Sequence, residues 1–541
     1  IVRNETSQTG VAGATEGAAG SFGGVPGGTA GLLKRFYDML RLKWLFFPML
    51  ALAGSAMAAP PALVRFATYN VSFFRTAPGA LVSEMNTPAG TSANHGNIRQ
   101  VAEALQRIRP DVLLLNEFDY DAAGDAMRLF QENYLSVPQA AGLTALVYPY
   151  RYASTSNTGI PSGFDLDNNG LAVSAPGTDA YGNDSFGFGI YPGQYAPAVF
   201  SKFPINAAAV RKFQLFKWKD MPNSQLLQTT GTPPLTTYYT VAERDVLRLS
   251  SKTHLDVPID LGGGILAHLL ISHPTPPTFD AAENKNGKRN FDEIRLWADY
   301  IDPARSGYLK DDSGVPGGLP AGARFVVGGD QNADPNDGDT LSGAARQLTQ
   351  HPLINATITP GSGANGGGVS FAGGAGQIGN KAFDTAAFSG GLRVDYVLPS
   401  KAGFSIFTGA VFWPGPSDPL RSVVGDTDPS DHHMVWMDLR PQISLLEAVE
   451  DLKAEWVEAG AGRAAGGAAG PGGPGVRLTW RAAAGYSYKV QQSPTMAAGT
   501  WADSGVVPVV EPGTLLASAV VPAGGPGEGR MFYRLEVGFA P

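Results

Sequence analysis

Acidic, amide and imidazole side chains recur at the ends of short apolar segments in this sequence. They are Asn70, Glu117, His273, Asp330, Asn332, Asp395, Asp431 and His432. Carboxylate oxygens suit hard cations such as Mg²⁺, Mn²⁺ or Ca²⁺. Neutral amides contact a metal or an anion without repelling it, and imidazoles donate hydrogen bonds or transfer protons. Together these residue types could support metal-assisted attack of water on phosphorus.

The apolar segments that precede these side chains predict strands. They cover residues 64–69, 111–115, 197–200, 265–271, 324–328, 394–398 and 434–438. Residues 97–108 have apolar positions at helical spacing and end at Pro110. Continuous apolar strands that alternate with helices are typical of an α/β fold whose sheets are covered on both faces. Because such sheets place sites outside their strand ends, we expect the polar side chains to meet at one edge.

Five short motifs follow one another along the chain. They are TYNV with Asn70, LLLNEFD with Glu117, GGDQN with Asp330 and Asn332, RVDYVL with Asp395, and SDHH with Asp431 and His432. In this order they resemble the endonuclease/exonuclease/phosphatase (deoxyribonuclease I-like) superfamily over about residues 64–440. The resemblance implies a four-layer αββα sandwich and a divalent-metal phosphoesterase. The stretch ISHPTPPTFD…NGKRNFDEIRLW further resembles a secreted subgroup of this superfamily.

The resemblance also implies metal ligands. Glu117 would be the main ligand, with Asn70 and Asp431 nearby. We expect Mg²⁺ as the cofactor, with Mn²⁺ or Ca²⁺ as alternatives.

The remaining roles concern the phosphate and the water. By the same resemblance, Asp330 would position the attacking water and Asn332 would bind the scissile phosphate. His432 would stabilise the phosphoryl group, and Asp395 would hold its imidazole in the right tautomer. His273 would donate from the other side of the phosphate. The common motif GDFN has Gln331 in place of Phe here, but both functional positions around it are retained.

Other polar residues leave alternatives open. Asp165, Asp167 and Asn169 precede Gly170 as in the first half of a calcium loop, but the twelfth position is Pro176. A structural Ca²⁺ and an Asx-turn loop both fit this segment. His433 should be structural, because neighbouring strand residues face opposite ways, whereas His254 could belong to the site or to a surface strand. Arg289, Asn290 and Glu293 form part of the site's surroundings without an assigned role.

The N-terminal region predicts an export signal rather than a folded element. Residues 1–38 are rich in small residues, and we expect them to be disordered or to lie upstream of the true start at Met39. Residues 39–58 have a basic run, about ten apolar residues and Ala-Met-Ala, the layout of a signal peptide cleaved after Ala58. A membrane anchor is the alternative. We therefore expect a secreted or periplasmic protein with no transmembrane segment after signal removal.

The remaining 483 residues fall into three predicted parts. Residues 59–440 are the α/β domain, and its segment 140–235 predicts long surface loops. Residues 441–475 include a Gly/Ala/Pro tract and predict a linker. Short strand-like runs in 476–541 predict a small all-β sandwich. The absence of cysteine excludes disulfides and thiolate metal sites.

Net charge bears on the substrate. The whole chain carries −8, and removal of five basic and three acidic residues with the signal leaves −10. Because proteins that hold duplex DNA use basic side chains on phosphates, the acidic balance favours a small or medium phosphate-ester substrate. An extracellular nuclease with nucleic acid as substrate is the alternative within this class. A catalytically silent binding or adhesion protein is the alternative from another class, and we expect a monomer in each case.

Overall fold

The computed structural model describes residues 61–227, 237–371 and 377–442 in full, and beyond them the backbone of short strands. The predicted signal peptide at 39–58 lies outside the described residues. The chain divides into two compact units, Ala58–Ser444 and a second unit of Ile1–Met57 with Leu445–Pro541. No helix among the described residues is long and apolar enough to cross a membrane.

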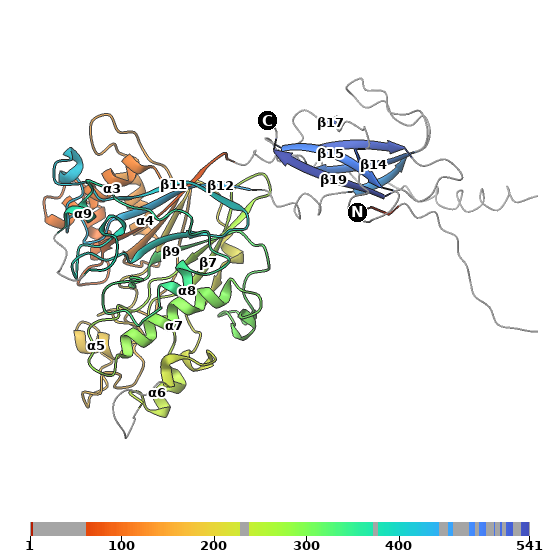
Figure 1. Cartoon of the computed structure of the whole chain (residues 1–541). Helices are drawn as coiled ribbons and strands as arrows, with labels where there is room; N and C mark the ends of the chain where they lie inside the picture. The colour runs from red at the N-terminus through yellow and green to blue at the C-terminus, as the bar shows by residue number, and fades with distance from the viewer. Residues whose placement is uncertain are drawn as a thin grey trace, which may run out of the picture. The chain divides into compact units, whose positions relative to one another are not determined.

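Two mixed β-sheets form the larger unit (Figure 1). The first has the order β11 (Phe404–Phe412), β12 (Met434–Pro441), β2 (Val64–Phe73), β3 (Val112–Phe118), β5 (Ala198–Ser201) and β4 (Tyr150–Ala153). The second has the order β10 (Asp395–Pro399), β9 (Phe325–Asp330), β8 (Leu266–Ile271), β7 (Leu255–Asp260) and β6 (Arg211–Lys212). Strands β2 and β3 are parallel, as are β8 and β9, and the other neighbours are antiparallel.

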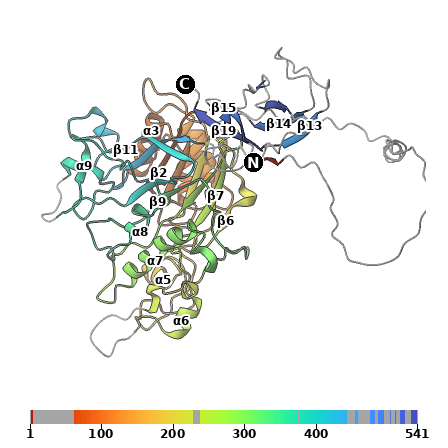
Figure 2. The same ribbon diagram turned by 45° about the vertical axis from the view of Figure 1, so that its right-hand side comes forward.

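Helices cover the outer face of each sheet (Figures 1 and 2). The two long ones are α3 (Ala93–Ile108) and α7 (Lys285–Tyr300). The short ones are α2 (Ala80–Met85), α4 (Asp125–Phe130), α5 (Asp179–Asn183), α6 (Val241–Val246), α8 (Arg346–Thr349) and α9 (Gly367–Ser370). The Ser92 side chain accepts from the His95 amide at the start of α3, and left-handed Arg109 ends the helix just before Pro110.

Three apolar cores lie between the four layers of the larger unit. One lies between α3 and the first sheet, a second between the two sheets, and a third between the second sheet and α7. Strand β3 shows why its sequence is continuously apolar. Leu113 and Leu115 face the helical core, whereas Val112 and Leu114 face the core between the sheets. The structure therefore confirms the predicted four-layer αββα sandwich.

Helix α7 buries charged side chains as well as apolar ones. Asp292 is 0% exposed, and its Oδ2 accepts from Trp218 Nε1 and Gln225 N, both at 2.6 Å. Its Oδ1 has no hydrogen-bond partner among the described residues. Burial raises the pKa of Asp292 to about 6, although both hydrogen bonds oppose the shift.

We expect Asp292→Asn to stabilise the protein at alkaline pH. A raised carboxyl pKa means that the folded state binds the proton more tightly, so wild-type stability falls as pH rises from about 4 through 6. The amide keeps an oxygen for both donors and removes the charge. Unfolding by urea should show equal stability at pH 4 and an advantage for the variant of about 2–3 kcal/mol at pH 8. An advantage that does not change with pH would contradict this account.

The smaller unit contains two four-stranded antiparallel sheets. Their orders are β1 (Val2–Arg3), β19 (Phe532–Phe539), β15 (Tyr486–Ser493), β16 (Ala502–Asp503), and β13 (Lys453–Val457), β14 (Gly475–Arg481), β18 (Leu516–Pro522), β17 (Val509–Val510). The described elements of this unit are thus all β-strands, and the predicted domain bounds of 476–541 stay a prediction. Strand β13 lies inside 441–475, where the sequence predicts only a linker. The linker prediction rests on the Gly-rich tract that follows Lys453–Val457. The polar and apolar residues of Lys453–Val457 alternate with the period of a strand, but so short a run is not recognised.

Candidate active site

The predicted polar side chains converge at one edge of the two sheets. Asn70 and Glu117 lie near the carboxyl ends of parallel β2 and β3, and His273 and Asp330 lie at the ends of parallel β8 and β9. Because parallel neighbours end at the same edge, each pair is brought together by the strand register itself. Asp395 begins antiparallel β10 directly opposite Asp330.

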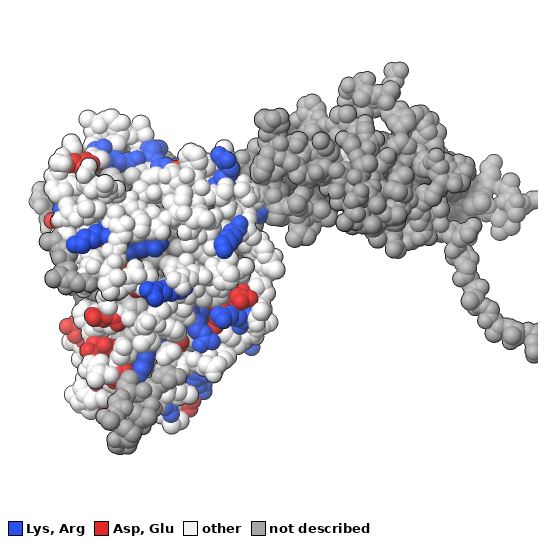
Figure 3. Space-filling model, in the orientation of Figure 1, with Lys and Arg blue, Asp and Glu red and all other residues white. Residues whose placement is uncertain are grey.

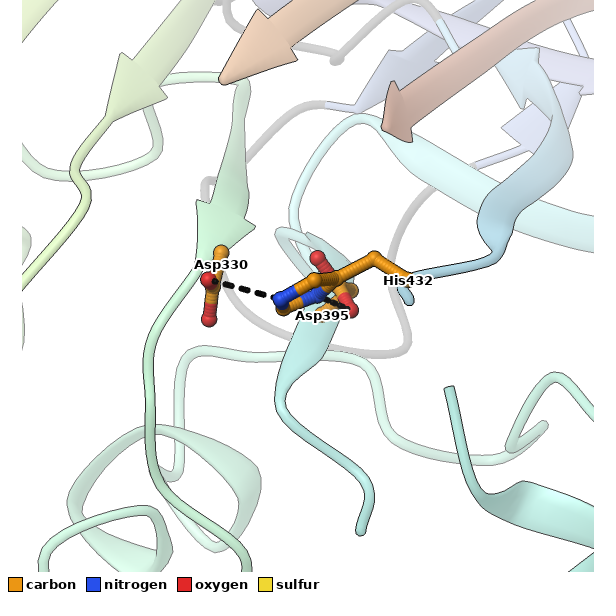
Figure 4. Close-up of side chains that lie close together, drawn as sticks. All are labelled: Asp330, Asp395 and His432. Carbon is orange, nitrogen blue, oxygen red and sulfur yellow. Dashed lines mark hydrogen bonds and ion pairs between the residues drawn. The ribbon is translucent and has the colours of Figure 1, made fainter. Parts of the chain in front are cut away.

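The ring of His432 lies between two carboxylates (Figure 4). Its Nδ1–H donates to Asp395 Oδ2 at 2.8 Å, and its Nε2 is 3.6 Å from Asp330 Oδ2. Thr385 Oγ1 also donates to Asp395 Oδ2, at 2.8 Å. All three members of the Asp395–His432–Asp330 relay are buried. The contact with Asp395 fixes the ring so that Nε2 faces Asp330.

Protonation in this relay is set by burial and by opposite charges. Burial raises the pKa of Asp330 to about 7, against the opposing effect of His432. Burial disfavours the His432 imidazolium, but the carboxylates of Asp395 and Asp330 outweigh it and raise the pKa of His432 above its usual range. A proton can therefore be held between Asp330 and His432 near neutral pH, as general acid–base chemistry requires.

A second imidazole faces Asp330 from the segment that follows the neighbouring strand β8. His273 Nε2 is 3.4 Å from Asp330 Oδ2 and 4.0 Å from Glu117 Oε1. Burial lowers the pKa of His273 well below its usual value, and the positive charges of Lys252 and His432 lower it further. His273 is thus a neutral ring beside a carboxylate. Asn70 Nδ2 donates to the same Asp330 Oδ2 at 3.2 Å.

The donor set fits a divalent cation. The Glu117 side chain is 19% exposed, and Asn70 is a hydrogen-bonding neighbour of its carboxylate. Burial raises the pKa of Glu117, whereas the cation of His432, the hydrogen bond from Asn70 and the cation of Lys252 oppose that rise. Buried Asp395 Oδ1 has no partner among the described atoms. This excess of oxygen donors and negative charge is what a hard metal ion neutralises.

The geometry groups the metal candidates differently from the sequence expectation. Asp330, Asp395 and His432 offer ligand atoms within 4.8 Å of one another. However, the Asp395–His432 hydrogen bond already occupies one atom of each. Glu117, whose carboxylate lies beside this group and is partly exposed, is better placed to bind a metal. Asp431 is half-buried and influences the pKa of Glu117 and His432 through its charge.

Backbone conformation at this edge is unusual for residues other than glycine. Ser72, Glu117 and Asn332 have φ angles of 51°, 60° and 49°. Such left-handed conformations cost about 1–3 kcal/mol and recur at functional sites. At Asn332 the turn lets its own amide N–H donate to Asp330 Oδ1 at 2.8 Å, while its Nδ2 donates to Pro274 O at 3.1 Å. The preceding Gly329 has φ 134°, and a Cβ there would lie 2.0 Å from Ser272 O.

Helix α7 ties down the loops that carry the site. The Glu293 carboxylate accepts from Ser251 N at 2.5 Å and from Thr275 N at 2.6 Å. Asn290 Nδ2 donates to Thr275 O and Gln331 O, both at 2.9 Å, and Arg289 Nε donates to Leu249 O. These three residues, left without a role by the sequence, therefore hold backbone segments in place.

The structure gives His254 and His433 structural roles. His254 is buried, its Nε2 lies 2.9 Å from Glu293 O, and its ring packs against Trp297. The His433 ring stacks on Trp413 with centroids 3.7 Å apart. Sequence reasoning left His254 open and expected His433 to be structural.

The candidate calcium loop differs in one member from the sequence expectation. Asp165, Asp167 and Asp184 bring carboxylate oxygens within 4.8 Å, whereas the Asn169 side chain accepts from Leu171 N. Asp184 comes from a separate segment and accepts backbone N–H groups of Leu166 and Val173. Calcium binding in this loop stays a prediction.

The sequence analysis gave no role to three residues that support the site. Asn116 Oδ1 accepts from Asp330 N at 3.2 Å, and Ser430 Oγ donates to Asn70 O at 2.8 Å. Lys252 is a buried cation beside the site, in the segment that leads into β7. A buried lysine in an otherwise ordinary loop gives no pattern in one sequence.

This fold and site define a hydrolase of phosphoric esters. The sequence profile of the Endonuclease/Exonuclease/phosphatase family matches residues 67–432, and the chain belongs to that family. Truncated TDP2 from Caenorhabditis elegans is similar in structure, with 15% identity, coverage of 70% of this chain and 98% of that one, and a TM-score of 0.33. ANGEL2, a 2′,3′-cyclic phosphatase, has corresponding values of 12%, 71%, 97% and 0.34. A comparison with curated protein sequences found no match.

Proposed function

We propose that this protein is an exported, divalent-metal-dependent phosphoesterase that acts on small or medium phosphate esters. The observation that carries the activity is the Asp395–His432–Asp330 relay, with neutral His273 and the partly exposed carboxylate of Glu117 beside it. A silent binding protein would have no use for a buried relay of carboxylates that costs stability.

Each residue of the site has its own proposed role in the reaction. A divalent cation held by Glu117, with Asn70 and Asp431 near it, would supply charge to neutralise the phosphoryl oxygens. Asp330 is placed to orient a water and accept its proton, because its pKa is raised to about 7. His432 would donate to the phosphoryl group from Nε2 while Asp395 holds Nδ1. Asn332 and His273 would donate hydrogen bonds to the same group.

Charge and surface favour a small ester over duplex DNA. On the described part of the face in Figure 3, Lys and Arg side chains stand apart among acidic and neutral ones, without a continuous basic band. Phe74 is 37% exposed and packs against Tyr195 at 4.7 Å between ring centroids, in a loop that contacts Asp119 beyond Glu117. This aromatic pair offers a surface for a base or another planar group of the ester.

A substrate panel crossed with a metal panel tests the proposal. Phosphomonoesters, small phosphodiesters and plasmid DNA would each be incubated with Mg²⁺, Mn²⁺ or Ca²⁺, and His432→Ala would serve as the blank. We expect turnover of a mono- or small diester that depends on added metal. Cleavage of plasmid DNA alone would make the protein a nuclease, and no turnover with any metal would favour a binding role.

Export is a separate part of the proposal and rests on the pattern of residues 39–58. After expression from Met39 in a bacterium, we expect exported protein to begin at Ala59. N-terminal sequencing of protein from the periplasm or medium measures this directly. Protein that retains the apolar run and sediments with membranes would support the anchor instead. Size-exclusion chromatography of the same sample tests the expected monomer.

A further inference from the structure

Lys252 is a buried cation at the edge of the site that neither the motifs nor the relay uses. It lies in the loop before β7, and its side chain is 7% exposed. Its Nζ donates to one backbone oxygen, Pro274 O, at a long distance of 3.4 Å. Among the described residues, no carboxylate lies within ion-pair distance of this ammonium group. An ammonium buried with a single weak acceptor is costly, so the pocket is incomplete without an anion.

The ammonium group of Lys252 lies on the side of the site that is proposed to bind phosphate. Pro274 follows His273, and its carbonyl accepts from both Lys252 Nζ and Asn332 Nδ2. The two donors therefore converge on one atom. Each has further N–H groups to offer, since an ammonium has three and an amide has two.

Lys252 interacts electrostatically with the groups of the site. Its cation lowers the pKa of Glu117 and of His273. Burial lowers the pKa of Lys252 itself, while Glu293, Glu117 and Asp330 act in the opposite direction. Glu293 is not its hydrogen-bonded partner, because both Glu293 oxygens accept backbone N–H groups of Ser251 and Thr275.

We propose that Lys252 is a substrate-binding residue whose ammonium group, beside Asn332, donates hydrogen bonds to a non-bridging oxygen of the substrate's phosphoryl group. The inference rests on the proposed function for its ligand, a phosphate ester. Glu293 is then a positioning residue, because it fixes the backbone of the two loops from which Lys252 and Pro274 extend. The cation would offset the carboxylates that otherwise repel an anionic substrate.

The test compares Lys252→Met with the wild type in binding of inorganic phosphate, measured by calorimetry with Mg²⁺ present. We expect Lys252→Met to raise the Kd for inorganic phosphate by about 10- to 100-fold, the usual effect of losing a charge-assisted hydrogen bond. The kcat/KM for the best ester should fall by about 100-fold. Lys252→Arg should recover part of both, because it restores the charge. Lys219→Met is the matched control, since Lys219 is exposed and pairs with Asp245 at the surface.

Stability measurements separate binding from a structural role. Removal of an unpaired buried cation should leave the free energy of unfolding unchanged or raise it. Unchanged phosphate affinity with a clear loss of stability would overturn the inference, and so would a wild type that does not bind phosphate. If the wild type hydrolyses no ester yet binds phosphate through Lys252, the proposed function fails while this inference stands. If esters are hydrolysed equally by Lys252→Met, the inference alone fails.

Discussion

Replacement of His432 by alanine is expected to lower kcat by about 10³- to 10⁴-fold, because it removes both the phosphoryl donor and the proton carrier. KM should change far less, since Asn332, His273 and the metal still bind the ester. The measurement is steady-state hydrolysis at saturating metal. Asp395→Asn should give a smaller loss of about 10²-fold, at the low end of the range for acid–base groups, because the ring stays in place but its protonated form loses a carboxylate partner at 2.8 Å.

Controls for this prediction must separate chemistry from folding. His432→Ala leaves the buried Asp395 carboxylate with Thr385 as its remaining side-chain donor, so some stability will be lost. His432→Gln keeps an amide donor near Asp395 and should fold while remaining inactive. His95→Ala is the matched control, because His95 is a half-buried histidine outside the site that contacts Ser92 and Thr87. A His432→Gln enzyme with more than about a tenth of wild-type kcat would contradict a role in proton transfer.

Glu117→Gln is expected to abolish activation by metal, with a loss of at least about 10³-fold in kcat/KM at Mg²⁺ concentrations that saturate the wild type. The amide has the same shape but lacks the charge that binds a hard cation. Loss of metal binding can also be measured without substrate, from the stabilisation of the folded protein by Mg²⁺. Mg²⁺ at about 100 times its Kd should stabilise the wild type by about 2.7 kcal/mol, and this gain should vanish in the variant.

The matched control for Glu117 is Glu132→Gln. Glu132 is an exposed carboxylate that pairs with Arg128 on the surface, so its loss should alter neither activity nor the response to metal. If Glu117→Gln is still stabilised by Mg²⁺ as strongly as the wild type, the metal binds elsewhere. The group of Asp330, Asp395 and His432 would then be the site to examine.

The sequence predicts the strands that are buried on both faces of their sheet. Strands such as β3 and β9 face a core on both sides, so their apolar runs are continuous and easy to recognise. Strand β7 escaped prediction because Pro258 and two aspartates interrupt its pattern, yet its Asp256 is satisfied by Tyr300 and His268. Helix α7 was missed because its buried face includes charged Arg289, Asp292 and Glu293.

The residues of the candidate site that lie in recognisable motifs could be predicted from the sequence. The relay of Asp330, Asp395 and His432 and the nearby Glu117 were all named from the sequence, because strand ends at a common edge must meet. What could not be predicted is the support beneath them. Glu293 and Lys252 contact backbone atoms of loops remote in sequence, and single-sequence patterns carry no information on such contacts.

The left-handed turns at Ser72, Glu117 and Asn332 have a consequence for engineering. At Glu117 and Asn332 glycine would relieve the backbone, so selection for heat resistance alone would reward the loss of the proposed metal ligand and of the proposed phosphate donor. A library screened only by melting temperature would therefore drift toward inactive proteins. Any thermostable variant of this enzyme should be selected on turnover and melting temperature together.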